Sequence, residues 1–269
     1  MAEMNQSVQP VRYHLRVNLT VKNHREEERA LWRIIRAGKI DEILFFVPHA
    51  EERSPGLGTD AECERMAGIL KPVFGRLRKA GVTPSINIWW TVAFSDFPAL
   101  PRSMRDRFRF RWAVNVDGHE SRAAACPLDP VWRAQTQRMY QTFAALKPER
   151  IWIDDDVRMT LRTDMQCACF CPECLTEMAR RTGKTFTRQE LLKAILADPP
   201  NPVREAWLDF HRQLELDIVG GLSPAVHVVS PETHVSIMYS TMEIHWAEGR
   251  RWGELIAALG HPTPHSRPG

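Results

Sequence analysis

Positions 150 to 158 read Arg150-Ile151-Trp152-Ile153-Asp154-Asp155-Asp156-Val157-Arg158. The apolar run near its start is typical of a buried strand, and three consecutive carboxylates follow it at once. Adjacent like charges repel, so at least one carboxylate must be neutralised by a proton, a cation or Arg158. The stretch therefore predicts a strand whose carboxyl end carries a functional site. The alternative is a cation site or a solvated strand end.

The three aspartates are the candidate catalytic residues. Regular pleating places Asp154 and Asp156 on one face of the strand and Asp155 on the other, so that two carboxylates can converge on a cavity. A carboxylic acid whose pKa is raised, for example by a charged neighbour, is what a glycosidase needs to protonate a leaving oxygen. We therefore expect proton-transfer chemistry at this strand end.

Apolar runs rich in β-branched and aromatic residues alternate with amphipathic segments along the chain, a pattern that predicts an α/β fold. The strands are expected at Tyr13 to Leu19, Glu42 to Pro48, Pro84 to Trp90, Arg150 to Asp154 and His234 to Tyr239. The helices are expected at Glu26 to Ala37, Ala61 to Ala80, Pro130 to Leu146, Pro202 to Val219 and Trp252 to Leu259.

No glycine-rich phosphate loop follows the first strand, which favours a (β/α)8 TIM barrel over a doubly wound sheet. A barrel takes about 250 residues, yet only about five to six strands fit here, because a long insertion separates the fourth strand from the fifth. The segment from Arg250 to Gly269 predicts one helix and a proline-rich end without a strand. Residues 1–269 are thus expected to form a partial barrel that exposes strand edges and self-associates.

Polar and aromatic residues gather where the expected strands end, which is the face that carries chemistry in a barrel. The candidates for substrate binding are Asn18, His49, Trp89, Trp90, Arg158, Tyr239 and His245. Tryptophan is common in cores, but large aromatic rings also stack on the apolar faces of sugar rings. The expected substrate is therefore a glycan or glycoside.

Six cysteines are present, at Cys63, Cys126, Cys167, Cys169, Cys171 and Cys174. The C-x-C-x-x-C segment from Cys169 to Cys174, together with Cys126, offers four thiolates, which suit a closed tetrahedral zinc site. Such a site is structural, because it leaves no open position for chemistry. We expect it to hold the long insertion, around residues 160–200, that follows the fourth strand.

The order of these features resembles glycoside hydrolase family 42, the TIM-barrel β-galactosidases. There a cysteine after the third strand is followed by a helix, a fourth strand ending in Asp-Asn-Glu, and C-x-C-x-x-C; residues 126 to 185 repeat this order. The resemblance implies that the four cysteines bind zinc. It also implies that Asp156 takes the place of the acid/base glutamate and Asp155 that of the asparagine. Both substitutions change the chemistry, so galactoside specificity does not carry over. The family's nucleophile lies on a seventh strand, beyond those expected here.

Two other readings remain open. Cys167, Cys171 and Cys174 have the C-x-x-x-C-x-x-C spacing of radical S-adenosylmethionine enzymes, which bind a [4Fe-4S] cluster. A non-catalytic carbohydrate or nucleic-acid binder is the other reading, because arginines at alternate positions from Arg105 to Arg111, preceded by Arg102, interleave with Phe108, Phe110 and Trp112.

The overall composition indicates which binding partners the protein lacks and in which cell compartment it is expected. The chain has 36 basic and 33 acidic residues, for a net charge of +3, so no global field draws it to nucleic acid or anionic lipid. The first ten residues lack the features of a secretory signal, and no apolar run is long enough to span a bilayer. We therefore expect a cytoplasmic protein that binds no membrane.

Overall fold

The computed structural model describes residues 12–47, 57–89, 91–92, 107–158, 168–239, 241–260 and 265–268. Its main sheet has six strands in the order β1-β2-β3-β6-β7-β8, with every neighbouring pair parallel. The strands are β1 (His14–Asn18), β2 (Glu42–Val47), β3 (Thr83–Ile88), β6 (Arg150–Ile153), β7 (His234–Tyr239) and β8 (His265–Pro268). Strand order follows chain order, as in a (β/α)8 barrel, whereas a doubly wound sheet reverses direction. The prediction of an α/β barrel with five to six strands is confirmed.

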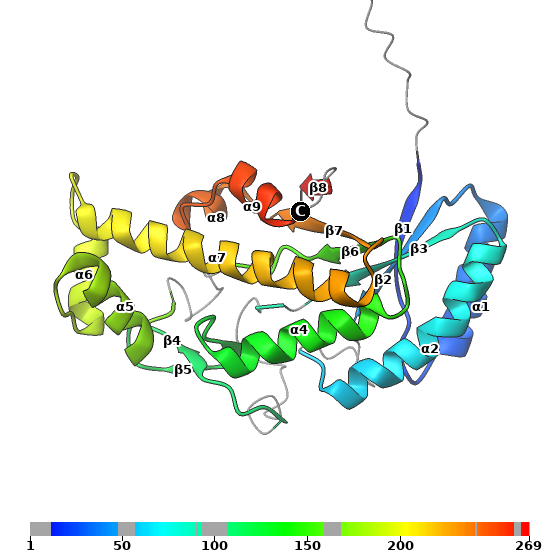
Figure 1. Ribbon diagram of the computed structural model, residues 1–269, viewed down its shortest axis with the longest axis horizontal. Helices are drawn as coiled ribbons and strands as arrows, with labels where there is room; N and C mark the ends of the chain where they lie inside the picture. Colours follow the sequence, from blue (N-terminus) through cyan, green and yellow to red (C-terminus); the bar gives the residue numbers. More distant parts are fainter. Residues whose placement is uncertain are drawn as a thin grey trace, which may run out of the picture.

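Helices cover one face of the sheet, and the part of the chain inserted after β6 forms one end of the molecule (Figure 1). The helices are α1 (His24–Ala37), α2 (Asp60–Lys79), α4 (Pro130–Ala144), α5 (Pro172–Thr182), α6 (Arg188–Leu196), α7 (Pro202–Val229), α8 (Met242–Ala247) and α9 (Trp252–Ala258). Local sequence fixes several helix starts. Asp129 caps α4 by accepting from the backbone N–H groups of Val131 and Trp132, and Thr59 and Glu62 form a capping box on α2.

The two faces of the sheet differ in chemistry because successive side chains of a strand point to opposite sides. The outer face is apolar: Ile43, Phe45 and Ile151 are fully buried in one core with side chains of α1, α2, α4 and α7. The inner face alternates with it and is largely polar, with buried groups that include Glu42, Ser85, Asn87, Arg150 and Asp154. The outer face of the sheet therefore packs into the apolar core, and the inner face carries the polar side chains that could take part in catalysis.

The helix expected to end at Val219 instead continues to Val229, through Gly220, Gly221 and Pro224. Its far half buries Leu222 and Val226 in the core, and this packing outweighs the low helix propensity of the intervening residues. A Cβ atom on Gly221 would lie 3.1 Å from the Gln137 amide of α4, so the glycine allows α4 and α7 to approach closely.

Two further elements correct the sequence-based expectations. The end of the chain, expected to contain no strand, contributes β8 beside β7. An antiparallel hairpin of β4 (Trp112–Val114) and β5 (Glu120–Ala125) lies between β3 and α4, where no strand was expected. Within the described ranges, no helix combines the length and apolar character needed to cross a bilayer.

Candidate active site and cysteine centre

Asp154 lies directly after β6, and its side chain meets the inner face of the sheet. Its carboxylate oxygen Oδ2 accepts a hydrogen bond of 2.7 Å from the Asn87 amide of β3 and lies 3.2 Å from an Arg16 guanidinium nitrogen of β1. The other oxygen accepts the backbone N–H of Asp155 at 2.8 Å. Residues from three strands thus converge on one carboxyl group, because β1, β2, β3 and β6 are consecutive in the sheet.

Burial and a hydrogen bond with the side-chain carboxyl of Asp155 raise the pKa of Asp154 to about 6, against an ordinary value of 3.8, while the backbone N–H of Asp155 favours the carboxylate and lowers it. The Asn87 hydrogen bond and the Arg16 charge act in the opposite direction, since both favour the carboxylate. The balance leaves a carboxyl group that changes protonation close to neutral pH. A group with this pKa can donate a proton and then hold the resulting negative charge beside a guanidinium.

The expected alternation of the three aspartates does not extend beyond the strand. The strand ends at Ile153, and Asp155 and Asp156 form a turn, so regular pleating no longer sets their directions. Asp156 is fully buried and accepts the backbone N–H of Val92 at 2.9 Å, whereas Asp155 is half-buried. Asp154 and Asp156 therefore contact different partners.

Arg158 was predicted to be close to the substrate, but its side chain is only 1% exposed. Its guanidinium lies 3.9 Å from a carboxylate oxygen of Asp155. Arg158 was one of three possible ways to neutralise the acidic strand end, beside a proton and a cation. Its guanidinium lies near Asp155, while the guanidinium of Arg16 lies near Asp154.

An aromatic group borders the Asp154 carboxyl on the inner face. The Arg16 guanidinium carbon lies 4.0 Å from the centroid of the Phe46 ring. Trp89, at the end of β3, meets that ring edge-on with centroids 5.9 Å apart. Asn18 is exposed and pairs in register with Phe46. The structure thus brings the predicted residues Asn18, Trp89 and Asp154 to one region of the inner face.

The other predicted substrate-binding residues do not join this region. Tyr239 and His245 are buried, and both rings pack on Trp252 with centroid distances of 3.2 Å and 4.6 Å. They are core residues beside α9 in this structure. His49 and Trp90 lie outside the described residues.

Sequence reasoning missed Arg16 and Asn87, the two side chains that bind Asp154. Arg16 lies at the centre of β1 and Asn87 near the carboxyl end of β3, both correctly predicted strands. Each is at an alternate position, and the adjacent residues Val17 and Ile86 face the outer core. The sequence did offer one signal for both residues, namely a polar side chain at a strand position that faces away from the apolar core. Which side chain such a residue contacts depends on which strands are adjacent, and the sequence does not show that.

A second cluster of polar side chains lies on the inner face, nearer the amino-terminal ends of the strands. Glu42 is fully buried and accepts a 2.5 Å hydrogen bond from the Ser85 hydroxyl, and its other oxygen lies 3.4 Å from both Arg150 and His14. This carboxylate is satisfied by its neighbours and has a structural role in joining β1, β2, β3 and β6.

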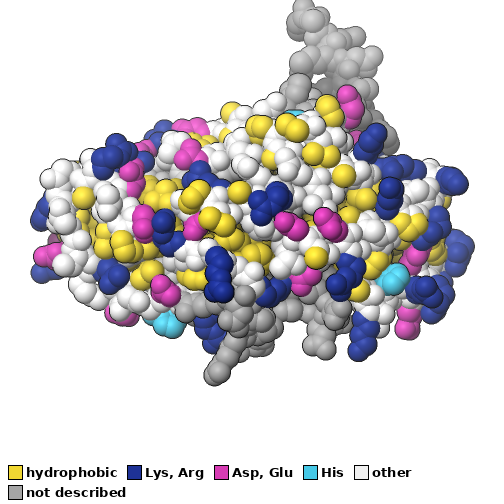
Figure 2. Space-filling model, turned by 60° about the horizontal axis from the view of Figure 1, so that its bottom comes forward, with side chains coloured by type: hydrophobic (Ala, Val, Ile, Leu, Met, Phe, Trp, Pro, Cys, Tyr) yellow, Lys and Arg dark blue, Asp and Glu magenta, His cyan; other side chains and the backbone are white. Residues whose placement is uncertain are grey.

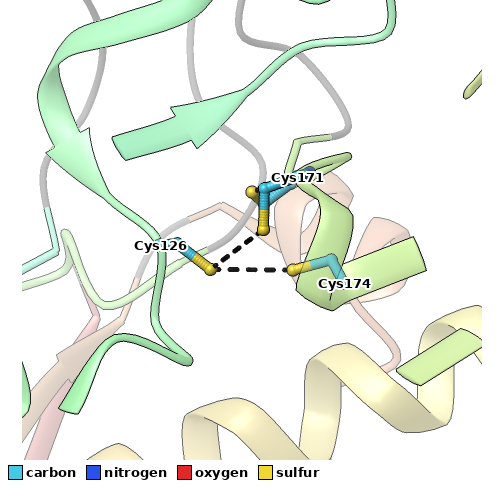
Figure 3. Close-up of side chains that lie close together, drawn as sticks. Cys126, Cys171 and Cys174 are labelled. Atoms are coloured by element: carbon cyan, nitrogen blue, oxygen red, sulfur yellow. Dashed lines mark hydrogen bonds between the residues drawn. The ribbon is translucent and has the colours of Figure 1, made fainter. Parts of the chain in front are cut away.

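Four cysteines converge at the junction of the hairpin and α5. Cys126 follows β5, Cys169 and Cys171 precede α5, and Cys174 lies in its first turn. Figure 3 shows the labelled sulfur atoms of Cys126, Cys171 and Cys174 turned toward one another. The Cys126 sulfur lies 3.6 Å from that of Cys171 and 3.7 Å from that of Cys174. All four sulfur atoms lie within 4.8 Å of one another.

This spacing fits a metal site. Zinc-sulfur bonds of about 2.3 Å in a tetrahedron require sulfur atoms about 3.8 Å apart. The Cys169 sulfur also accepts backbone N–H groups from Val114 at 3.3 Å and Cys171 at 3.4 Å, an arrangement that stabilises a thiolate. Hydrogen bonds from the neighbouring thiols lower the pKa of Cys171 well below its ordinary value. The four buried side chains are a candidate metal centre.

The two rival readings depend in part on residues outside the described ranges. The cluster contains Cys171 and Cys174 with Cys126 and Cys169, while Cys167, which the iron-sulfur spacing requires, lies outside the described residues. In the arginine-rich segment, Phe108 and Trp112 are buried in the core. Figure 2 shows acidic side chains interspersed with basic ones across one face of the molecule.

No protein-family model and no curated protein sequence matches the chain. Among solved structures, the chain is similar to the catalytic domain of β-amylase from Paenibacillus polymyxa, with a TM-score of 0.63 at 10% identity over 96% of this chain and 76% of that one. It is also similar to the PgaB (BpsB) glycoside hydrolase domain from Bordetella bronchiseptica, with a TM-score of 0.57 at 15% identity over 96% and 74%.

A β-galactosidase from Rahnella sp. R3 matches with a TM-score of 0.56 at 14% identity over 97% of this chain and 39% of that one. At these identities the likeness establishes the fold and leaves the resemblance to family 42 a prediction. The chain has the fold of TIM-barrel glycoside hydrolases.

Proposed function

We propose that the protein is a glycoside hydrolase that binds a glycan or glycoside at the carboxyl ends of its strands, with Asp154 as the proton-transferring carboxyl. The observation that supports this proposal is the inner-face carboxyl of Asp154, with a pKa raised to about 6, between Asn87 and Arg16. The resemblance to family 42 favours Asp156 for the same role. Its complete burial and its hydrogen bond from Val92 support a role in holding the loop after β3.

In the proposed reaction, protonated Asp154 donates its proton to the glycosidic oxygen as the bond from that oxygen to the anomeric carbon breaks. Water supplies the hydroxyl group that the anomeric carbon gains and the proton that restores Asp154, so the products are the free sugar and the alcohol. The carboxylate that remains is stabilised by the Arg16 guanidinium and by the Asn87 amide, which also fixes its orientation. Trp89, with its ring set against Phe46, is the proposed platform for the apolar face of a sugar ring. Asn18, at the exposed end of β1, would donate a hydrogen bond to a hydroxyl group of the sugar or accept one from it.

We further propose that the four cysteines hold a zinc ion with a structural role. They connect the β4-β5 hairpin to α5, so the ion would anchor the insertion around residues 160–200 against the barrel. Four thiolates fill the coordination of zinc, which leaves the chemistry to Asp154. Free thiols at this centre fit a reducing compartment such as the cytoplasm.

The test measures turnover and binding of a panel of nitrophenyl glycosides and oligosaccharides. It compares the unsubstituted protein, called the parent below, with the variants Asp154→Asn, Asp156→Asn and Asp198→Asn. Asp198 is an exposed carboxylate in the turn after α6 and serves as the control. We expect turnover by the parent and Asp198→Asn and none by Asp154→Asn. A general acid with a pKa of about 6 predicts that kcat/KM falls as pH rises above 6. Loss of activity in Asp156→Asn alone would return the role to Asp156, and no binding of any sugar would contradict the proposal.

A further inference from the structure

A buried ionic cluster joins three segments next to the acidic strand end. The Arg250 side chain, 1% exposed, places its Nε atom 2.8 Å from a carboxylate oxygen of Glu215 on α7 and 2.8 Å from one of Glu248. The same guanidinium donates a hydrogen bond to the backbone carbonyl of Val157. Arg250 therefore connects α7, the segment after α8 and the residue that follows Asp156.

The raised pKa of Glu215 favours a proton in this cluster. Two carboxylates share one guanidinium, and burial together with the Glu248 charge raises the pKa of Glu215 well above its ordinary value. A protonated Glu215 leaves one carboxylate and one guanidinium, so no net charge is buried. His211, one turn earlier on α7, is fully buried and its pKa is lowered to about 4, so it is neutral and adds no charge.

The Val157 carbonyl belongs to the turn that carries the acidic residues. Along this turn the backbone N–H of Asp155 donates to the Asp154 carboxylate, and the backbone N–H of Arg158 donates to the carbonyl of Asp156. Val157 lies between these bonded residues, directly after the fully buried Asp156. A fixed Val157 carbonyl therefore limits how far the turn can move from the sheet.

We propose that Arg250 is a positioning residue that holds the 155–158 turn and thereby keeps the Asp154 carboxyl enclosed on the inner face. The inference rests on the proposed role of Asp154. Glu215 and Glu248 orient the guanidinium from two sides, and the proton on Glu215 allows both carboxylates to lie against it. A side chain that only joined α7 to the segment after α8 would have no effect on the proton affinity of Asp154.

The test measures that proton affinity without a substrate. The free energy of unfolding is followed by urea denaturation from pH 3.5 to 8 in the parent, Arg250→Lys and Arg212→Lys, each with and without Asp154→Asn. Arg212 is the matched control, because it joins α7 to α9 through Glu254 without touching the acidic strand end. The difference between each pair changes with pH from the pKa of Asp154 in the unfolded chain up to its pKa in the folded protein. The pH at which the difference levels off therefore reports the folded-state pKa of Asp154.

We expect the difference to level off near pH 6 in the parent and in Arg212→Lys, and at least half a pH unit lower in Arg250→Lys, where the loosened turn admits water. An Arg250→Lys variant that is less stable but whose difference levels off at the parental pH would overturn the inference. If that variant does not fold, Glu248→Gln with Arg250→Gln removes the charge pair together and is held to the same criterion.

Turnover separates this inference from the proposed function. If the parent hydrolyses a glycoside, Arg250→Lys should lower kcat more than it raises KM, and should shift the pH limb of Asp154 in the same direction. If no variant, including the parent, turns over any glycoside, the proposed hydrolase function fails. The pH at which the unfolding difference levels off still decides whether Arg250 positions Asp154.

Discussion

At the scale of single residues, the environment of Asp154 makes stability depend on pH in an uncommon direction. Its pKa is about 6 in the folded protein against 3.8 ordinarily, so the folded state binds the extra proton between these values. The free energy of unfolding therefore falls by about 3 kcal/mol as pH rises from about 4 to 6, because the pKa of Asp154 is about 2 higher in the folded protein than in the unfolded chain. Asp154→Asn should match the parent below pH 4 and exceed its free energy of unfolding by up to this amount above pH 6. Urea unfolding across this range checks it, and a difference independent of pH would contradict the assigned cause.

Ionisation of Glu215 should also lower the stability of the fold as pH rises, whereas ionisation of the surface residue Glu177 should raise it. Because the folded pKa of Glu215 is raised, Glu215→Gln should leave stability unchanged near pH 4 and increase it at pH 8. Arg180 and Arg181 lower the pKa of Glu177 to about 2, so Glu177→Gln should cause a small loss at pH 8 that disappears toward pH 2. Thermal unfolding at pH 4 and pH 8 distinguishes the two. An equal effect of both variants would argue against a protonated Glu215.

At the scale of elements, the cysteine centre joins the hairpin to α5. Cys171→Ser should remove most of the bound zinc and destabilise the fold, because the free energy of metal binding is part of the free energy of folding. Cys63, buried in α2 with its pKa raised to about 12, is the matched control, and Cys63→Ser should retain the metal. Elemental analysis of purified protein should give about one zinc per chain. Iron, or zinc retained in full by Cys171→Ser, would contradict a four-cysteine zinc site.

The continuous helix α7 offers a comparison of two adjacent glycines. A Cβ atom on Gly220 would meet nothing within 4 Å, so Gly220→Ala should stabilise the protein by about 0.5 to 1 kcal/mol through helix propensity. The same atom on Gly221 would lie 3.1 Å from Gln137 of α4, so Gly221→Ala should gain less or lose stability. Equal gains in chemical denaturation would indicate that α4 and α7 pack less closely than described.

At the scale of the whole molecule, the sheet has two ends. Within the described residues, β1 and β8 each have a neighbouring strand on one side only. Exposed strand edges pair with other chains, so the 31.0 kDa protein should self-associate reversibly as its concentration rises. Light scattering coupled to size-exclusion chromatography from micromolar to millimolar concentration measures this. A constant monomer mass over that range would show that the edges are protected.

The sequence by itself determined five strands of the main sheet, most helix starts and the cysteine set, because these depend on local periods, caps and spacing. His234–Tyr239 was predicted at its observed bounds, and Cys126 with Cys169, Cys171 and Cys174 was predicted as one centre. The continuation of α7 beyond Gly221 was not predictable, because packing against α4 overrides the propensity of residues 220–224. Hairpin β4-β5 and strand β8 likewise depend on pairing with distant or weakly patterned partners.

The candidate site shows the same division. The acidic strand end was evident from residues 150–158, but only the tertiary structure decided which aspartate meets the inner face and what surrounds it. Asp154 contacts Asn87 and Arg16, which lie 67 and 138 residues away in sequence, because β1, β2, β3 and β6 are consecutive strands of one sheet. Asp156 is buried because the strand ends and the chain turns at residue 155. Local sequence sets the period of each element, whereas contacts between elements depend on their order, register and packing.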